Sequence, residues 1–176
     1  MSEKILSLFA LFCFAMGCAG LEPMQVREAK YGKAVPVLHQ SFASKQLRPG
    51  DTWKVYLQAA DPDGDMKNIV CTIDQPGVGG YPVSITRIKG DNRKELSGYI
   101  YLNTFTGSLK QLEFVNLILT VQIEDMAGHL SKPAVFPLSF SSRFMQEPPP
   151  PGTFQEKDLG PIMIELKGLK PFKGVD

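Results

Sequence analysis

The feature that most constrains this chain is a run of alternating residues, DTWKVYLQAAD, from Asp51 to Asp61. At every second position the side chain is apolar, in the set Trp53, Val55, Leu57 and Ala59. The positions between them hold Thr52, Lys54, Tyr56 and Gln58. A period of two is that of a β-strand with one buried face. The preceding RPGD supplies a turn, so the segment predicts a strand that starts after a tight bend.

Other stretches with a similar pattern predict strands at 37–43, 67–74, 81–88, 96–103, 113–123 and 132–140. They are separated by QPGVGG, KGDNRK, TGSLK and DMAGH, which are rich in turn-forming residues. Together with the first segment they make about seven strands, and no convincing amphipathic helix is evident in the mature chain. We therefore expect an all-β fold, an antiparallel sandwich in which two sheets bury their inner faces.

The inward-facing residues of these strands should meet in one core. The expected core residues are Trp53, Val55, Leu57, Ile69, Cys71, Ile73, Leu117, Leu119, Val121, Phe136 and Leu138. Cys71 is in phase with Ile69 and Ile73, so we interpret it as a small buried hydrophobic residue. A nucleophilic cysteine would need a nearby histidine or another cation.

The N-terminal segment MSEKILSLFALFCFAMGCAG has the features of an export signal. Its apolar stretch, Ile5 to Met16, is too short to span a hydrocarbon core of about 30 Å as a helix. The residues AMGC resemble the lipobox of bacterial lipoproteins, in which the signal is cut before the cysteine and that cysteine carries lipid. The resemblance implies lipidation of Cys18, for example by palmitate, and Ala19 after it implies the outer membrane. Plain secretion and a membrane-retained anchor are the alternatives.

These features divide the chain into four regions. The signal peptide is 1–17, and 18–34 is predicted to be a flexible lipid-anchored tether. The sandwich is expected at 35–145. Region 146–176 begins with EPPPPG, a polyproline spacer, and ends in a tail in which Ile162, Ile164 and Leu166 alternate with other residues. That tail docks on its own sheet edge, stays loose, or adds a strand to another protein.

The segments PGDTWKVYLQAADPDGD and TVQIEDMAGHLSKPAVFPLSF resemble immunoglobulin-like or cadherin-like modules of bacterial surface proteins. In such modules an acidic turn follows the second strand, and a D-x-x-G-x-x-S turn joins the last two strands. The likeness covers roughly residues 35–140 and implies an immunoglobulin-like sandwich. It says little about function, because this fold hosts many unrelated binding roles.

The acidic turn DPDGD raises the question of a calcium site. Asp61, Asp63 and Asp65 provide a D-x-D-x-D start, but the glycine and the distal glutamate of an EF-hand loop are not in their places. An immunoglobulin-like sandwich would bring Glu124 and Asp125 to the same end of the domain, which makes five acids a candidate calcium site. The alternative is a turn whose carboxylates accept hydrogen bonds from nearby backbone N–H groups.

The sequence offers little for catalysis or for nucleic-acid binding. The net charge is +1, and the chain has no Lys/Arg run longer than two residues, which argues against a nucleic-acid partner. Only two histidines occur, and His129 is interpreted as an exposed loop residue. No catalytic or phosphate-binding motif is present, so we do not expect an enzyme. Tyr99 and Tyr101 should face outward beside Tyr56, as a candidate partner-binding surface.

The leading hypothesis is a non-enzymatic, lipid-anchored protein of the cell envelope that acts as a binding or adaptor module for another envelope protein or glycan. One alternative is a calcium-dependent adhesive or carbohydrate-binding module, which would use the acidic end and the tyrosine face. Another is an envelope enzyme, which would need a pocket in which His129 meets carboxylates.

Overall fold

The computed structural model describes residues 22–105 and 112–167. The predicted signal peptide, the lipidation residue Cys18 and the last part of the tail lie outside the described residues. The first elements along the chain are α2 (Met24–Tyr31), β1 (Val37–Ala43), β2 (Gln46–Leu47), β3 (Thr52–Ala60), β4 (Met66–Gln75) and β5 (Gly79–Gly80). They are followed by β6 (Ser84–Arg87), η2 (Gly90–Asn92), β7 (Glu95–Asn103), β8 (Asn116–Asp125), β9 (Ala134–Phe140) and β10 (Asp158–Pro161).

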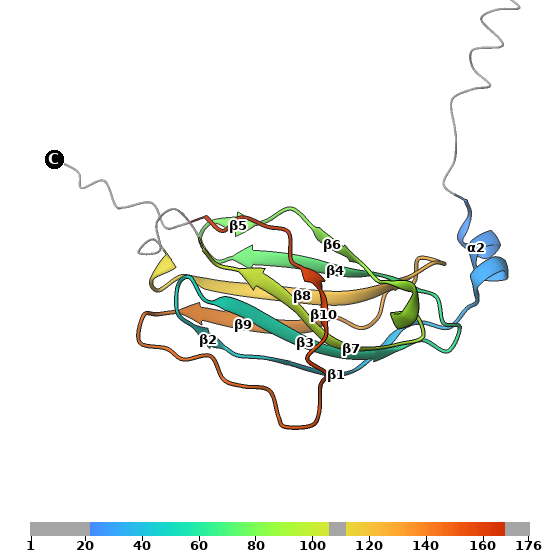
Figure 1. The fold of residues 1–176 in the computed structure, drawn as a ribbon. Coiled ribbons are helices and arrows are strands. Elements are labelled where there is room, and N and C mark those ends of the chain that lie inside the picture. Colours follow the sequence, from blue (N-terminus) through green and yellow to red (C-terminus); the bar gives the residue numbers. More distant parts are fainter. Residues whose placement is uncertain (1–21, 106–111, 168–176) are drawn as a thin grey trace, which may run out of the picture.

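The strands form two sheets that pack on each other (Figure 1). One sheet has the order β1-β3-β7-β10, and the other has the order β2-β9-β8-β4-β5, with β6 also paired to β4. The alternation seen in the sequence places one face of each strand in the shared core. All the residues expected in the core are buried there, from Trp53 on β3 to Leu138 on β9. The prediction of an all-β chain built from two packed sheets is therefore confirmed.

Each predicted strand has a counterpart, but the described residues form ten strands and not about seven. The additional strands are β2, β5 and β10, of two to four residues each. Two pairings are parallel, β2 with β9 and β10 with β7, so the sheets are not purely antiparallel. Segments this short have no period of their own, and their pairing depends on neighbours that are distant in sequence.

Helix α2 corrects the expectation that the segment before the sandwich is a flexible tether. It lies within the predicted tether, at one end of the sandwich (Figure 1). None of its residues is buried, and its N-cap, Pro23, makes no side-chain capping bond. A helix without a buried apolar stripe leaves no periodic signal in the sequence, which explains why it was missed. Among the described residues, no helix is long and apolar enough to cross a membrane.

Much of the segment after β9 packs on the sandwich, which is one of the alternatives that the sequence left open. It crosses to the four-stranded sheet, where β10 pairs with β7 at the edge (Figure 1). Ile162 and Leu166 are buried in the core, which bears out the docked alternative for the described part of the tail. A side chain at Gly98 of β7 would overlap the carbonyl oxygen of Lys157, so a glycine is needed where the tail crosses β7.

Candidate functional site

The acidic turn between β3 and β4 and the loop between β8 and β9 lie at the same end of the sandwich. Antiparallel pairing of β4 with β8 sets Met66 opposite Asp125, so the residues just before Met66 meet those just after Asp125. The Met126 N–H donates to the Asp65 carbonyl oxygen at 3.2 Å and links the two loops directly. The register of the central strands thus brings the two groups of acids together, as the sandwich prediction required.

Three of the five candidate ligands converge. One carboxylate oxygen from each of Asp61, Asp65 and Asp125 lies within 4.8 Å of the other two. Asp61 and Asp125 are each only 1% exposed. Oδ2 of Asp61 and Oδ1 of Asp65 are buried and accept no hydrogen bond from any described residue. Unsatisfied buried carboxylate oxygens are costly, which makes this acidic triangle of Asp61, Asp65 and Asp125 a candidate site for a positively charged ligand.

Each carboxylate of the acidic triangle has one oxygen that accepts hydrogen bonds from backbone N–H groups. Asp61 Oδ1 accepts the N–H of Asp63 at 2.8 Å, and Asp65 Oδ2 accepts that of Met126 at 3.2 Å. Asp125 Oδ1 accepts the N–H groups of Gly128 and His129, at 2.6 Å and 2.8 Å. The turn hypothesis, in which the carboxylates accept backbone hydrogen bonds, therefore accounts for one oxygen of each carboxylate. It leaves the free oxygens of Asp61 and Asp65 without a role.

The surroundings of the acidic triangle disfavour the ionised form of two of its carboxyl groups. Burial, followed by the negative charges of Asp125 and Asp61, raises the pKa of Asp65 from 3.8 to about 6. Burial is also the main reason why the pKa of Asp61 is raised. Among the described residues, no lysine or arginine forms an ion pair with any of the three carboxylates. Two negative charges at such a distance disfavour each other, and a bound cation would relieve this.

The remaining two candidate ligands do not join the acidic triangle. Asp63 Oδ2 accepts the N–H of Ala34 at 2.7 Å, in the segment that follows α2. Glu124 Oε2 accepts from Asn68 Nδ2 at 2.6 Å. Glu124 precedes Asp125 on β8, and successive side chains of a strand point to opposite faces, so only Asp125 can turn toward the other acids.

His129 is not the exposed loop residue that the sequence suggested. Its side chain is 10% exposed, with Nδ1 2.7 Å from Asp125 Oδ2 and Nε2 3.2 Å from Glu28 Oε1. Burial lowers its pKa, but the hydrogen bonds to Asp125 and Glu28 outweigh burial and raise the pKa above 6.5. Glu28 belongs to α2, a contact across 101 positions that no local pattern could reveal.

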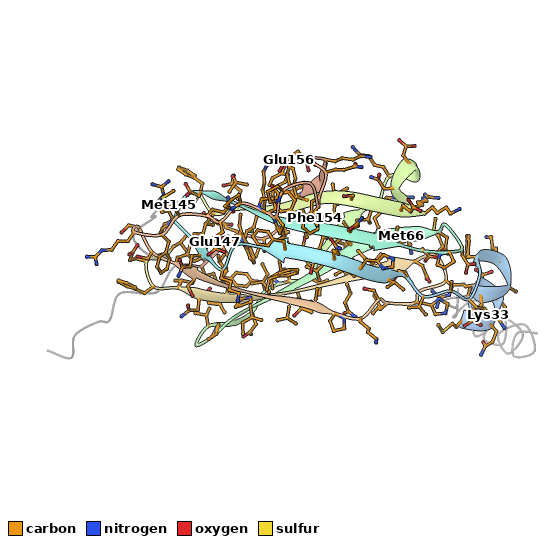
Figure 2. All side chains as sticks on the ribbon, turned by 90° about the horizontal axis from the view of Figure 1, so that it is seen from below. Lys33, Met66, Met145, Glu147, Phe154 and Glu156 are labelled. Atoms are coloured by element: carbon orange, nitrogen blue, oxygen red, sulfur yellow. The ribbon has the colours of Figure 1, made fainter. Side chains whose placement is uncertain are left out.

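The tyrosine face is oriented as predicted but is covered in part by the chain itself. The Tyr56 and Tyr99 rings meet edge-on, with centroids 5.6 Å apart. Phe154 from the tail packs on Tyr56, and Glu156 Oε1 accepts the Tyr56 hydroxyl at 2.7 Å. Figure 2 shows Phe154 and Glu156 over the four-stranded sheet to which Tyr56 and Tyr99 belong. Tyr56 is only 4% exposed, and Tyr99 and Tyr101 are half-buried, so the partner surface proposed from sequence is smaller than expected.

Cys71 lies in the core with 1% exposure, and burial raises the pKa of its thiol to about 12. This agrees with its interpretation as a hydrophobic residue.

Comparison with known proteins found no matching family model and no matching curated protein. The functional proposal therefore rests on the acidic triangle.

Proposed function

We propose that this protein is a calcium-binding module of the cell envelope, whose ion is held by the acidic triangle of Asp61, Asp65 and Asp125. The observation that carries the proposal is the pair of buried, unpartnered oxygens on Asp61 and Asp65, close to a third buried carboxylate. An ion there would replace the missing hydrogen-bond donors and neutralise the mutual repulsion of the acids.

The donor atoms favour a hard cation. Calcium is bound by oxygen ligands, chiefly carboxylates, carbonyl groups and water, and it tolerates irregular geometry. All three converging groups are carboxylates, and the nearest histidine nitrogen is already bonded to Asp125. Zinc would favour histidine or cysteine, and Cys71 belongs to the core.

An immunoglobulin-like topology is part of the proposal. The order β1-β3-β7 in one sheet and β4-β8-β9 in the other corresponds to strands A-B-E and C-F-G of that fold. β10 occupies the place beside β7 where strand D would lie, although it runs parallel to β7. The strand order supports the assignment. The same topology accounts for the meeting of the two acidic loops at one end.

The calcium proposal is tested by thermal melting of the purified full-length protein, first with chelator and then with calcium. At a hundredfold excess over its dissociation constant, calcium should stabilise the fold by about 2.7 kcal/mol, a rise in melting temperature of about 5–10 °C. Asp65→Asn should abolish the rise. The matched control Glu124→Gln alters an acid outside the acidic triangle and should keep it. An unchanged melting temperature in the wild-type protein would refute calcium binding.

The location of the protein in the cell envelope is a separate proposal. We infer from the AMGC segment that Cys18 is lipidated and that the module is held at the outer membrane, where it serves as a non-enzymatic binding or adaptor protein. Metabolic labelling with radioactive palmitate should mark the wild-type protein and leave Cys18→Ser unlabelled. Label that persists in the Cys18→Ser variant would remove the lipoprotein assignment.

A further inference from the structure

We propose that the cation in the acidic triangle also clamps helix α2 to the sandwich, so that ion binding fixes the position and orientation of α2 relative to the two sheets. This inference rests on the proposed function, because it needs the ion. It adds a second consequence of ion binding, which is the position of α2.

Helix α2 has little to hold it in place apart from polar contacts. It is eight residues long, buries none of its residues and has no side-chain cap at its N-terminus. Isolated helices of this length are unstable in water, and most helical stability in proteins comes from an apolar face that packs on a core. The position of α2 must therefore depend on the few contacts that it makes with the two acidic loops.

The first contact joins the end of α2 to the β3–β4 turn. Asp63 Oδ2 accepts the Ala34 N–H at 2.7 Å. Gly32, with φ +115°, lies so close to Asp63 that any side chain there would overlap its carboxylate. The N–H of Asp63 in turn donates to Asp61 Oδ1. This anchor of α2 is therefore one hydrogen bond away from a member of the acidic triangle.

The second contact joins the body of α2 to the β8–β9 loop. Glu28 Oε1 lies 3.2 Å from His129 Nε2, while His129 Nδ1 lies 2.7 Å from Asp125 Oδ2. The Arg27 guanidinium lies against Gly128, where an added Cβ would approach Nη1 to 2.7 Å. The N–H of Gly128 donates to Asp125 Oδ1. This anchor is also one residue away from the acidic triangle.

Helix α2 is thus held by contacts with two loops, and the same two loops carry the carboxylates of the acidic triangle. Calcium ligands lie at about 2.3–2.6 Å from the ion, so one ion bound to Asp61, Asp65 and Asp125 would fix the spacing of the loops. Without the ion, the repulsion of three carboxylates within 4.8 Å of one another opposes the Met126–Asp65 backbone hydrogen bond that joins the loops, and favours wider spacing. Wider spacing would prevent α2 from contacting Asp63 and His129 together.

Coupling of this kind is reciprocal: if calcium favours docking of α2, then docking of α2 raises calcium affinity by the same factor. The helix lies between the sandwich and the segment that leads back to Cys18. Calcium would therefore give α2 a defined orientation relative to the sandwich.

The test is amide hydrogen exchange of the purified full-length protein, with calcium and with chelator. Calcium should slow exchange in α2, including the Gly32 amide that donates to Glu28, by a factor within about 5–150, the usual range for coupled sites. The variant Glu28→Ala/Asp63→Ala removes the carboxylate from each of the two anchors and leaves the acidic triangle intact. It should lose this protection, keep a calcium-dependent rise in melting temperature, and bind calcium more weakly.

The matched control is Glu95→Ala/Glu165→Ala, which removes the same charge from two exposed positions outside these loops and should behave as wild type. Calcium that raises the melting temperature but leaves α2 exchange unchanged would overturn the clamp and retain the calcium site. Protection that persists in Glu28→Ala/Asp63→Ala would also overturn it. If calcium changes neither quantity, both proposals fail. If the variant does not fold, the comparison of α2 amide exchange in the wild-type protein with calcium and with chelator decides whether the clamp exists.

Discussion

Asp65 occupies the least favourable place for a negative charge at the acidic end. Its Oδ1 is buried without a hydrogen-bond partner among the described residues, and Asp61 and Asp125 lie beside it. Asp61 Oδ2 is also buried without a partner, and the pKa of Asp61 is raised too, but the larger rise is that of Asp65, to about 6. Asp65 is therefore the residue whose ionisation should respond most clearly to the presence of a cation.

This predicts a pH dependence of stability in the metal-free protein. The pKa of Asp65 is raised from 3.8 to about 6, so the carboxyl group contributes stability that is full below pH 3.8 and is lost as the pH rises through about 6. The raised pKa values of Asp61 and His129 act with the same sign. The Asp65→Asn variant has no carboxyl group that titrates at this position, so it does not lose this stability as the pH rises. In chelator, urea unfolding should show the variant gaining stability over wild type between pH 4 and pH 7.

The control for this titration is Glu124→Gln, because the Glu124 side chain is bonded to Asn68 and lies outside the acidic triangle. Its stability relative to wild type should not follow the same course with pH. A difference between Asp65→Asn and wild type that stays constant from pH 4 to pH 7 would contradict the assigned environment of Asp65.

At the scale of elements, β10 and the residues before it are integral to the four-stranded sheet. Tyr99 N–H donates to the Lys157 carbonyl oxygen at 2.9 Å, and Ile162 N–H donates to that of Tyr101 at 2.7 Å. Lys54 Nζ lies 2.8 Å from Glu156 Oε2 on the same face. This exposed ion pair adds little, and the buried side chains after β10 matter more.

Gly98→Ala tests whether the tail is held this closely. The added methyl group would overlap the Lys157 carbonyl oxygen and approach Leu159, so β10 must shift away from β7. We expect a loss of about 1–3 kcal/mol in the free energy of unfolding, the usual cost of overpacking, and faster amide exchange at 158–162. Gly90→Ala is the control, because nothing lies within 4 Å of its added Cβ. Equal stability of the two variants would show that the tail is not packed on Gly98.

The limits of sequence-based prediction follow from the same elements. Long strands with one buried face, such as β3, carry their period in their own residues, so their extent and their core residues could be predicted. Helix α2 and β10 are held by contacts with distant residues and have no such period. The acidic turn and the expected sandwich together suggested five calcium ligands. Hydrogen bonds to Ala34 and Asn68 direct two of them, Asp63 and Glu124, away from the other three.

At the scale of the whole molecule, the two ends of the sandwich differ. The acidic end carries α2 and both acidic loops, and Figure 2 shows Lys33 at this end with Met145 toward the opposite one. Register between β4 and β8 assembles the acidic triangle, while α2 connects that end to the N-terminal segment. Ion binding, stability of the sandwich and orientation of α2 are thereby linked through one group of carboxylates.

The most direct test of the central claim is a crystal structure of the protein grown with calcium, with anomalous diffraction used to locate the ion. We predict one anomalous peak between Asp61, Asp65 and Asp125, at about 2.3–2.6 Å from an oxygen of each residue, with α2 seated on both loops. Crystals with saturating calcium that show no peak there, and Asp61 Oδ2 and Asp65 Oδ1 still without partners, would contradict the account.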